Sequence, residues 1–274
     1  MNRLKGELGK CSTGRQALVS SFGPHFGEEA PLVGNGGSGT IFFAFCNLKC
    51  CFCQNYTISQ LGEGRDVEAR ELAGMMLSLE RRGCHNINLV SPTHVVPQIL
   101  EALETAVEAG LSVPLVYNSG GYDAVGTLKL LDGIFDIYMP DMKYSDGQNA
   151  LRFSGINEYP QMNRAAVNEM HRQVGDLRLD ANSVATRGLL VRHLVLPDGL
   201  AGTDEVCRFL SHEVSTNTYL NVMAQYHPCY RAYDVPELAR SISRKEFVEA
   251  IETARSYGLH RLDRIEPRPF VGVL

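Results

Sequence analysis

Residues 40–55 read Thr40-Ile41-Phe42-Phe43-Ala44-Phe45-Cys46-Asn47-Leu48-Lys49-Cys50-Cys51-Phe52-Cys53-Gln54-Asn55. The first six of these residues are apolar, β-branched or aromatic, which is typical of a strand. Four cysteines follow within the next eight residues. Ligand sites of parallel sheets lie at the carboxyl ends of the strands. We therefore expect the cysteines to lie at the mouth of a sheet, where chemistry is found.

Short apolar runs alternate with longer helical patterns along the rest of the chain. The strand candidates are Thr40–Phe45, Asn86–Val90, Val113–Tyr117, Ile134–Met139, Leu189–Leu196 and Tyr219–Ala224. The helix candidates are Val67–Arg82, Val95–Ala109, Asp123–Leu131, Pro160–Val174, Thr203–Val214 and Arg244–Tyr257. This alternation predicts an α/β fold with a parallel sheet. About six βα units are too few for the eight-stranded barrel, so an incomplete barrel and an open doubly wound sheet remain as alternatives.

Composition indicates an ordinary folded protein. The chain has 274 residues, 44% of them hydrophobic and 21% charged, which disfavours disordered, collagen-like and coiled-coil classes. The formal charge of -5 argues against a general nucleic-acid or anionic-membrane binder, because both partners attract a positive surface. No apolar run reaches the ~20 residues of a membrane span, and the first residues lack a signal-peptide pattern. We expect a cytoplasmic protein.

Three of the clustered cysteines, Cys46, Cys50 and Cys53, stand in a C-x3-C-x2-C arrangement. In a reducing compartment such a cluster indicates metal or redox chemistry before disulfides. Three thiolates are one short of the usual four ligands of a [4Fe–4S] cluster, so one iron would stay open to bind another molecule.

Two other interpretations of the cysteines are weaker. A closed zinc site needs four ligands, commonly as two pairs, and here the fourth would have to be Cys51, His85 or another distant residue. A thioredoxin-like pair of Cys50 and Cys53 would normally open a helix, and it would leave Cys46 without a role.

The cysteine spacing, with the aromatic Phe52 just before the last cysteine, resembles the radical S-adenosylmethionine superfamily. Several further stretches are similar to the pyruvate formate-lyase activating enzyme-like branch of that superfamily: residues 36–43, Cys53-Gln54-Asn55-Tyr56, Ile58-Ser59-Gln60, residues 139–144, residues 170–177 and residues 191–197. The match runs from about Gly6 almost to the C-terminus. It implies an incomplete (β/α)6 TIM-like barrel over residues 39–274, preceded by an N-terminal extension over residues 1–38.

The resemblance also implies a cofactor site and a reaction. Cys46, Cys50 and Cys53 would hold a [4Fe–4S] cluster whose open iron chelates S-adenosylmethionine, and Phe52 would lie beside the adenine. Cys51 would be a neighbouring packed thiol. Reductive cleavage of S-adenosylmethionine would give a 5′-deoxyadenosyl radical, which abstracts hydrogen from a substrate.

The substrate that the resemblance implies is a glycine Cα–H on a glycyl-radical enzyme, and the electron donor is a protein such as flavodoxin or ferredoxin. Another small-molecule or protein target is an alternative within this class. The alternative from a different class is a non-catalytic iron–sulfur or zinc-binding protein.

This sequence departs from the branch in two places. A Gly-Gly-Glu that contacts the amino group of S-adenosylmethionine is replaced by Leu89-Val90-Ser91-Pro92-Thr93-His94, where the hydroxyls of Ser91 and Thr93 or local carbonyls would have to substitute. Members of the branch often begin with a cysteine-rich stretch, and only Cys11 matches its end. Either Met1 is a truncated or misassigned start, or an accessory metal site is absent.

Other strand ends supply further candidates for cofactor contacts. Asn118-Ser119-Gly120-Gly121 follows the third strand, and glycine there lets backbone approach a ligand closely. Asp141 and Lys143 follow the fourth, and His227 follows the sixth. A simple turn explains the glycines about as well, and a salt-bridged strand end is the alternative interpretation of Asp141 and Lys143. His94 and His193 are at least as well explained as hydrogen-bonded core histidines. Arg192 would pair either a ligand carboxylate or an internal acid. No residue is assigned a catalytic role from the sequence.

Overall fold

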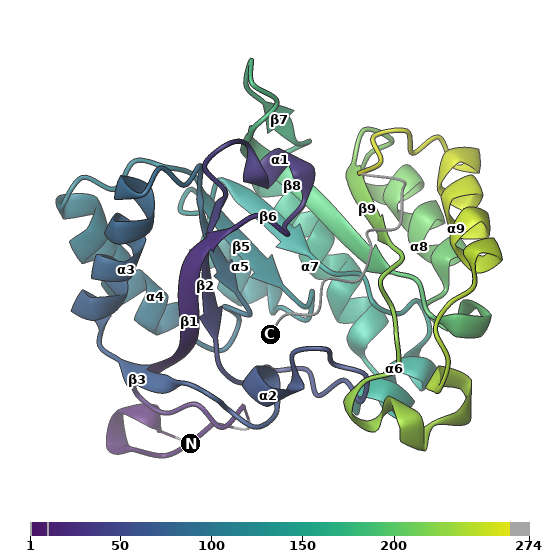
Figure 1. The fold of residues 1–274 in the computed structure, drawn as a ribbon, viewed down its shortest axis with the longest axis horizontal. Coiled ribbons are helices and arrows are strands. Elements are labelled where there is room, and N and C mark those ends of the chain that lie inside the picture. The colour runs from purple at the N-terminus through teal and green to yellow at the C-terminus, as the bar shows by residue number, and fades with distance from the viewer. Residues whose placement is uncertain (1, 10, 264–274) are drawn as a thin grey trace.

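The computed structural model describes residues 2–9 and 11–263 of the chain. Its centre is a curved sheet in which each strand pairs in parallel with the next (Figure 1). The strands are β2 (Ser38–Phe43), β4 (Ile87–Val90), β5 (Leu115–Ser119), β6 (Ile137–Pro140), β8 (Ala185–Leu194) and β9 (Tyr219–Met223). These six strands are the six that the sequence predicts.

The sheet does not close on itself. On the β2 side it continues into two antiparallel strands, β1 (Ala17–His25) and β3 (Arg65–Val67). On the other side β8 pairs with β9 and with the two-residue β7 (Arg178–Leu179). The fold is therefore an incomplete barrel, as predicted.

Helices cover the outside of the sheet (Figure 1). The longer helices are α3 (Ala69–Arg81), α4 (Val96–Glu108), α7 (Tyr159–Val174) and α9 (Arg244–Ser256), and the shorter ones are α1 (Ala30–Val33), α2 (Tyr56–Ser59), α5 (Val125–Leu130), α6 (Gly147–Ser154) and α8 (Thr203–Phe209). Local chemistry sets some of their ends: α9 begins at a capping box in which Ser243 and Glu246 bond reciprocally, which satisfies backbone donors that the helix leaves free.

The two faces of the strands have different partners, because successive side chains on a strand point to opposite sides. Leu89, Tyr117, Tyr138 and Leu189 are neighbours in register and pack with the helices in the main core. The alternate residues Val116, Ile137 and Leu190 belong to a separate apolar cluster that includes Leu32 of α1. This second cluster fills part of the barrel interior.

Two features near the N-terminus were not predicted from the sequence. β1 lies within the expected extension over residues 1–38, yet it pairs with β2 through Phe22↔Ile41 and its neighbours, so the boundary at residue 38 falls inside the sheet. The short α1 lies between β1 and β2 in the chain and supplies Leu32 to the interior. Within the described residues, no helix combines the length and the apolar character needed to cross a bilayer.

Candidate functional site

The cysteine loop, residues 44–55, leaves the carboxyl end of β2 and is pinned to its surroundings by backbone bonds. The N–H of Phe45 donates to the carbonyl of Ile58 at 3.0 Å, and the N–H of Cys51 donates to the carbonyl of Phe153 at 2.8 Å. The N–H of Arg231 donates to the carbonyl of Cys51, also at 2.8 Å. Segments far apart in sequence therefore fix the path of the loop.

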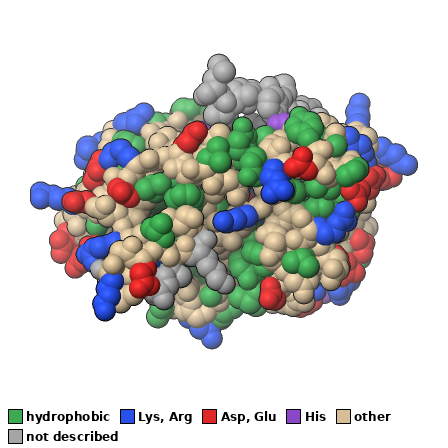
Figure 2. Space-filling view, turned by 90° about the horizontal axis from the view of Figure 1, so that it is seen from below, with side chains coloured by type: hydrophobic (Ala, Val, Ile, Leu, Met, Phe, Trp, Pro, Cys, Tyr) green, Lys and Arg blue, Asp and Glu red, His purple; other side chains and the backbone are tan. Residues whose placement is uncertain are grey.

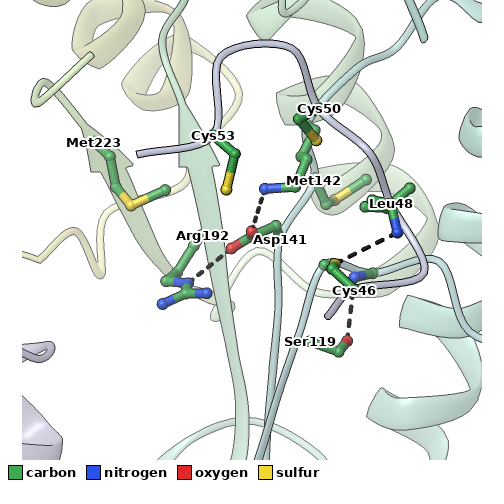
Figure 3. A network of polar contacts seen from close by, with 12 residues as sticks. Cys46, Leu48, Cys50, Cys53, Ser119, Asp141, Met142, Arg192 and Met223 are labelled. Carbon is green, nitrogen blue, oxygen red and sulfur yellow. Dashed lines mark hydrogen bonds and ion pairs between the residues drawn. The ribbon is translucent and has the colours of Figure 1, made fainter. Parts of the chain in front are cut away.

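Each of the three motif cysteines has a polar neighbour at its sulfur. Cys46 Sγ accepts from the N–H of Leu48 at 3.4 Å, and Cys50 Sγ accepts from Ser154 Oγ at 3.0 Å. Cys53 Sγ lies 3.0 Å from Ser59 Oγ. Figure 3 shows the three cysteines on one arch of the chain, with Asp141 and Arg192 beside it.

The thiols of Cys46 and Cys53 are held where ionisation is unfavourable without a cation. Burial, followed by the neighbouring Cys50, raises the pKa of Cys46 to about 12, and the same two causes raise the pKa of Cys53. Coordination to iron deprotonates a thiol outright, and thiolate ligands are formed as the metal binds. The environment therefore favours thiols that ionise only on binding a metal group.

The donor set fits a [4Fe–4S] cluster with one open iron, which takes three thiolates from the protein. Among residues 2–9 and 11–263, no three His, Cys, Asp or Glu side chains converge closely enough to hold a single metal ion. A closed zinc site needs four such ligands around one ion, whereas the ligands of a four-iron cluster each bind a different iron. All eight cysteines are free thiols.

Asp141 is the centre of a charged network beside the cysteine loop (Figure 3). Its Oδ2 accepts from Lys143 Nζ at 2.5 Å, and its Oδ1 accepts from Arg192 Nε at 2.8 Å. Arg192 Nη2 in turn donates to Asn118 Oδ1 at 2.7 Å. Arg192 thus pairs an internal acid, which is one of the two roles left open by the sequence.

The two cations decide the ionisation of Asp141. Burial alone would raise its pKa, but Arg192 and Lys143 outweigh burial and hold the pKa below its usual value. Burial would lower the pKa of Lys143, and Asp141 and Cys50 raise it instead. Because the charge of Cys50 acts on Lys143, the charged pair lies beside the cysteine loop. Its contact with S-adenosylmethionine stays a prediction.

Ser91 and Thr93, which stand in place of the Gly-Gly-Glu, differ from each other in their structural roles. Thr93 Oγ1 donates to the buried carboxylate of Asp123 at 2.7 Å, which also accepts from Tyr117 and Ser119. The Thr93 hydroxyl is therefore engaged within the protein and does not replace the missing acid. Ser91 has φ of 60°, a left-handed conformation that is uncommon for a residue with a side chain and often marks a functional position.

The Gly120-Gly121 turn has a structural reason that the sequence did not suggest. A Cβ on Gly121 would lie 2.1 Å from the carbonyl oxygen of Asp141 and 2.2 Å from Asn163 Nδ2, and the residue has φ of 74°. The close approach at Gly121 is to the protein's own backbone. Asn163 Nδ2 donates to the carbonyls of both Gly121 and Asp141, which ties the two strand ends together.

The remaining candidates lie around the same loop. Phe52 is buried and packs edge-on against Tyr144 and Tyr226, and its contact with adenine stays a prediction. His227 Nδ1 lies 3.1 Å from Gln54 Nε2, one residue after Cys53. Cys51 is half-buried and packs against the apolar cluster that contains Phe52, Tyr144 and Tyr226, as expected for a neighbouring thiol.

Two histidines hold the backbone of the site. His94 Nε2 lies 2.9 Å from the carbonyl of Ala44, at the start of the cysteine loop. His193 Nδ1 lies 2.7 Å from the carbonyl of Met142, between Asp141 and Lys143. Burial lowers the pKa of both side chains. Both are hydrogen-bonded core histidines, the interpretation that the sequence analysis favoured at least equally.

The sequence missed a group of buried polar residues inside the barrel, Glu28, Glu29 and Asn88, and the half-buried Asn221 next to them. Glu29 accepts from Asn221 Nδ2 at 2.9 Å and lies 4.0 Å from Arg192. Two adjacent acids before Pro31 look like an exposed helix start in sequence, and only the tertiary structure shows that they point inward.

Comparisons with known proteins give a relative in sequence and two solved structures of similar fold. No family model matches the chain. The Uncharacterized protein MJ0674 of Methanocaldococcus jannaschii is 32% identical over 263 residues, which cover 92% of this chain and 71% of that protein.

Two solved structures have a similar fold. A radical SAM methyltransferase from Sphaerobacter thermophilus superposes with a TM-score of 0.57 at 15% identity, over 81% of this chain and 64% of its own. Native anSMEcpe with bound AdoMet superposes with a TM-score of 0.52 at 11% identity, over 78% of this chain and 58% of its own. The chain thus spans about three fifths of each, and at these identities the likeness shows the fold.

Proposed function

Because this chain belongs to the same family as the Methanocaldococcus jannaschii protein MJ0674 and has the fold of radical SAM enzymes, we propose that it is itself a radical S-adenosylmethionine enzyme. The observation that carries the proposal is the place of the C-x3-C-x2-C motif. Cys46, Cys50 and Cys53 lie on the loop that leaves β2 at the carboxyl end of the parallel strands, where barrels of this type hold their reactive groups.

Cys46, Cys50 and Cys53 would hold a [4Fe–4S] cluster. When bound and reduced, the cluster supplies the electron that cleaves S-adenosylmethionine to methionine and a 5′-deoxyadenosyl radical. The protein's task is to bind, orient and shield the reacting atoms. The cofactor-facing residues would be Phe52, Ser91, Asn118, Asp141, Lys143 and His227.

For four of these residues, contacts in the structure support a role. The Lys143 ammonium and the Asp141 carboxylate are a preformed pair of opposite charges, suited to the zwitterionic amino-acid part of S-adenosylmethionine. Arg192 and Asn118 keep the Asp141 carboxylate in place. His227 and Gln54 close the side of the loop next to β9.

The finer proposal is that the abstracted hydrogen belongs to a glycine Cα of a partner protein, with flavodoxin or ferredoxin as the electron donor. The similarity of residues 36–43, 139–144 and 191–197 to the activating-enzyme branch supports it. The departure at Ser91 and Thr93 lies on the cofactor side of the reaction and leaves the choice of substrate open to experiment.

The first test is anaerobic reconstitution with iron and sulfide, dithionite reduction, electron paramagnetic resonance with and without S-adenosylmethionine, and a 5′-deoxyadenosine assay. We expect a [4Fe–4S]+ signal that shifts with S-adenosylmethionine, together with 5′-deoxyadenosine. Cys50→Ala should lose both. Cys51→Ala, one residue away on the same loop, should keep both. A stable zinc content with no cluster and no cleavage would sink the proposal.

The glycine target is tested with a candidate partner protein labelled with deuterium at the glycine Cα. Direct abstraction moves one deuterium into 5′-deoxyadenosine, which mass spectrometry detects. Turnover that leaves 5′-deoxyadenosine unlabelled, with the partner present, would contradict the glycyl target and retain the radical chemistry.

A further inference from the structure

A cavity of about 420 Å³ lies between the N-terminal segment and the strands β1 and β3. Figure 1 shows the N-terminal segment beside β3. The volume is within the range of about 300–1,000 Å³ that small-molecule sites occupy. None of the residues that line this cavity is among the proposed contacts of the cluster or of S-adenosylmethionine. The cavity is therefore a separate candidate for a ligand site.

Hydrogen bonds to α4 and to the loop before it hold the wall of this cavity in place. Gln98 Nε2 on α4 donates to the carbonyls of Gly14 at 3.2 Å and Arg15 at 2.8 Å. Arg3 Nη1 donates to the carbonyl of His94 at 2.6 Å, which ties the N-terminal segment to the loop between β4 and α4. Ligand sites are usually largely formed before the ligand arrives. A wall that is fixed in this way meets that condition.

One side of the cavity is apolar, because Leu8, Leu18 and Phe45 line it. Leu8 is 64% exposed, and Leu18 and Phe45 are half-buried. A ligand group that covers these side chains removes apolar surface from water, which is favourable. This side of the cavity therefore favours an apolar ligand group.

The other lining residues include two opposite charges, Arg15 and Asp66. Both residues are exposed. In the part of the chain that the structure describes, neither side chain makes an ion pair or a hydrogen bond, with the other or elsewhere. A guanidinium binds carboxylates well, and a carboxylate accepts hydrogen bonds from an ammonium group. Two opposite charges that line one cavity without meeting fit a ligand that itself carries both charges.

The backbone gives an independent observation at the same cavity. Ser12 has φ of 61° and Phe45 has φ of 64°, and both residues line the cavity. This left-handed conformation is uncommon for a residue with a side chain, and most of all for a bulky one. Such strained residues cluster at ligand-binding and active sites. Two of them at one cavity therefore point to a binding role.

We propose that this cavity binds an α-amino acid with a large apolar side chain. The carboxylate of the ligand pairs with the guanidinium of Arg15, and its ammonium group pairs with the carboxylate of Asp66. The side chain of the ligand lies against Leu8, Leu18 and Phe45. Each of the three groups that an apolar amino acid presents thus has a matching partner in one cavity.

The position of Phe45 brings the ligand to the cysteine loop. Phe45 directly precedes Cys46 in the chain, and its N–H donates to the carbonyl of Ile58. A bound amino acid therefore contacts the first part of the loop that would carry the cluster. Binding itself does not depend on the proposed radical chemistry, so the two ideas are tested separately and either can fail alone.

The test measures binding by calorimetry at pH 7 with the purified full chain, with and without S-adenosylmethionine. L-phenylalanine should bind at one saturable site. Three related compounds each lack one of its features: 3-phenylpropanoate has no ammonium group, 2-phenylethylammonium has no carboxylate, and glycine has no apolar side chain. Each should bind at least about tenfold more weakly, since a charge-assisted bond or the apolar contact is lost.

The variants separate recognition from folding. Arg15→Gln and Asp66→Asn should each weaken the binding of L-phenylalanine at least about tenfold, because each removes one charge that pairs with the ligand. Both residues are exposed, so both variants should keep the fold, which circular dichroism checks. Arg70→Gln, which changes an exposed arginine of α3 outside the cavity, should bind as the parent protein does.

The place of binding is read from amide hydrogen exchange, which reports local opening of the chain. Exchange should slow on binding at residues 12–18 and 44–47, and it should stay unchanged at residues 101–109. The absence of saturable binding, equal affinity for glycine, or unchanged affinity in folded Arg15→Gln and Asp66→Asn would overturn the amino-acid site. Displacement of S-adenosylmethionine by L-phenylalanine would place the ligand in the cofactor site and would overturn it as well.

Discussion

Replacing Gly121 with alanine should destabilise the protein and displace the Asp141 segment. The new Cβ would meet the carbonyl oxygen of Asp141 at 2.1 Å and Asn163 Nδ2 at 2.2 Å, where side-chain movement alone cannot relieve both clashes. The left-handed conformation at φ 74° adds a cost of about 1–2 kcal/mol for a residue with a Cβ.

The two costs can be added. Overpacking of a tight site costs about 1–3 kcal/mol, and loss of chain freedom in the unfolded state returns about 0.4–1 kcal/mol. The expected loss of unfolding free energy is therefore about 1–5 kcal/mol, centred near 3. It should appear as a lower midpoint in urea unfolding followed by circular dichroism, with an unchanged slope.

Gly126→Ala is the matched control for this variant. Gly126 lies in α5, and a Cβ there would meet nothing within 4 Å. Alanine is favoured over glycine in a helix by about 1 kcal/mol, so this variant should be more stable than the parent protein. If the unfolding free energy of Gly121→Ala lies within about 0.5 kcal/mol of the parent value, the two strand ends do not approach each other closely enough to exclude a Cβ at residue 121.

Other substitutions test the buried acids Glu28 and Asp123 and the capping box of α9. Removing Glu28 should change the pH dependence of stability. Its folded pKa of about 8 lies above the usual 4.5, so the folded state holds the extra proton, and stability falls as pH rises from about 4.5 to 8, by up to about 5 kcal/mol. In Glu28→Gln this decline should disappear from urea titrations at each pH, and an equal slope in both proteins would contradict it. Asp123→Ala leaves three hydroxyls, two of them buried, without their acceptor and should cost about 3 kcal/mol or more; a cost below about 1 kcal/mol would mean that water replaces the carboxylate. Ser243→Ala removes the capping box of α9 and should cost about 1 kcal/mol, measured by thermal unfolding, and no loss would show that packing alone fixes the end of this helix.

The sequence predicts the parallel strands well because their apolar runs are bounded by glycine and helical patterns. It misses β1 because Gly23 and Pro24 interrupt that strand and suggest a loop. The structure explains why proline is tolerated there: β3 pairs with β1 only at Ala17–Val19, so Pro24 lies where that side of β1 has no neighbouring strand. A two-residue strand such as β7 carries no periodicity at all.

The residues of the candidate site were likewise predictable from the sequence only in part. The cysteines, Asp141 and Lys143 are visible because they follow recognisable strands at fixed spacing. The sequence suggests that the Thr93 hydroxyl could contact the cofactor, but in the structure this hydroxyl binds Asp123, which lies 30 residues further along the chain. No local sequence pattern indicates that hydrogen bond. Asn88 looks like any polar residue in a strand, and only the register, which sets it beside Thr40 and Val116, shows that it faces the interior.

The barrel interior holds polar side chains next to apolar ones. Leu32, Val116 and Ile137 belong to an apolar cluster, and the buried Asn88 lies in register with Val116. The buried Glu28 carboxyl is a cost to folding, since burial raises its pKa and the protonated acid still gives up its hydration. Such unfavourable groups persist where function requires them. Glu28→Gln should therefore be more stable than the parent protein at pH 8 by urea unfolding. A Glu28→Gln variant that is less stable than the parent at pH 8 would show that this carboxyl contributes to the stability of the fold.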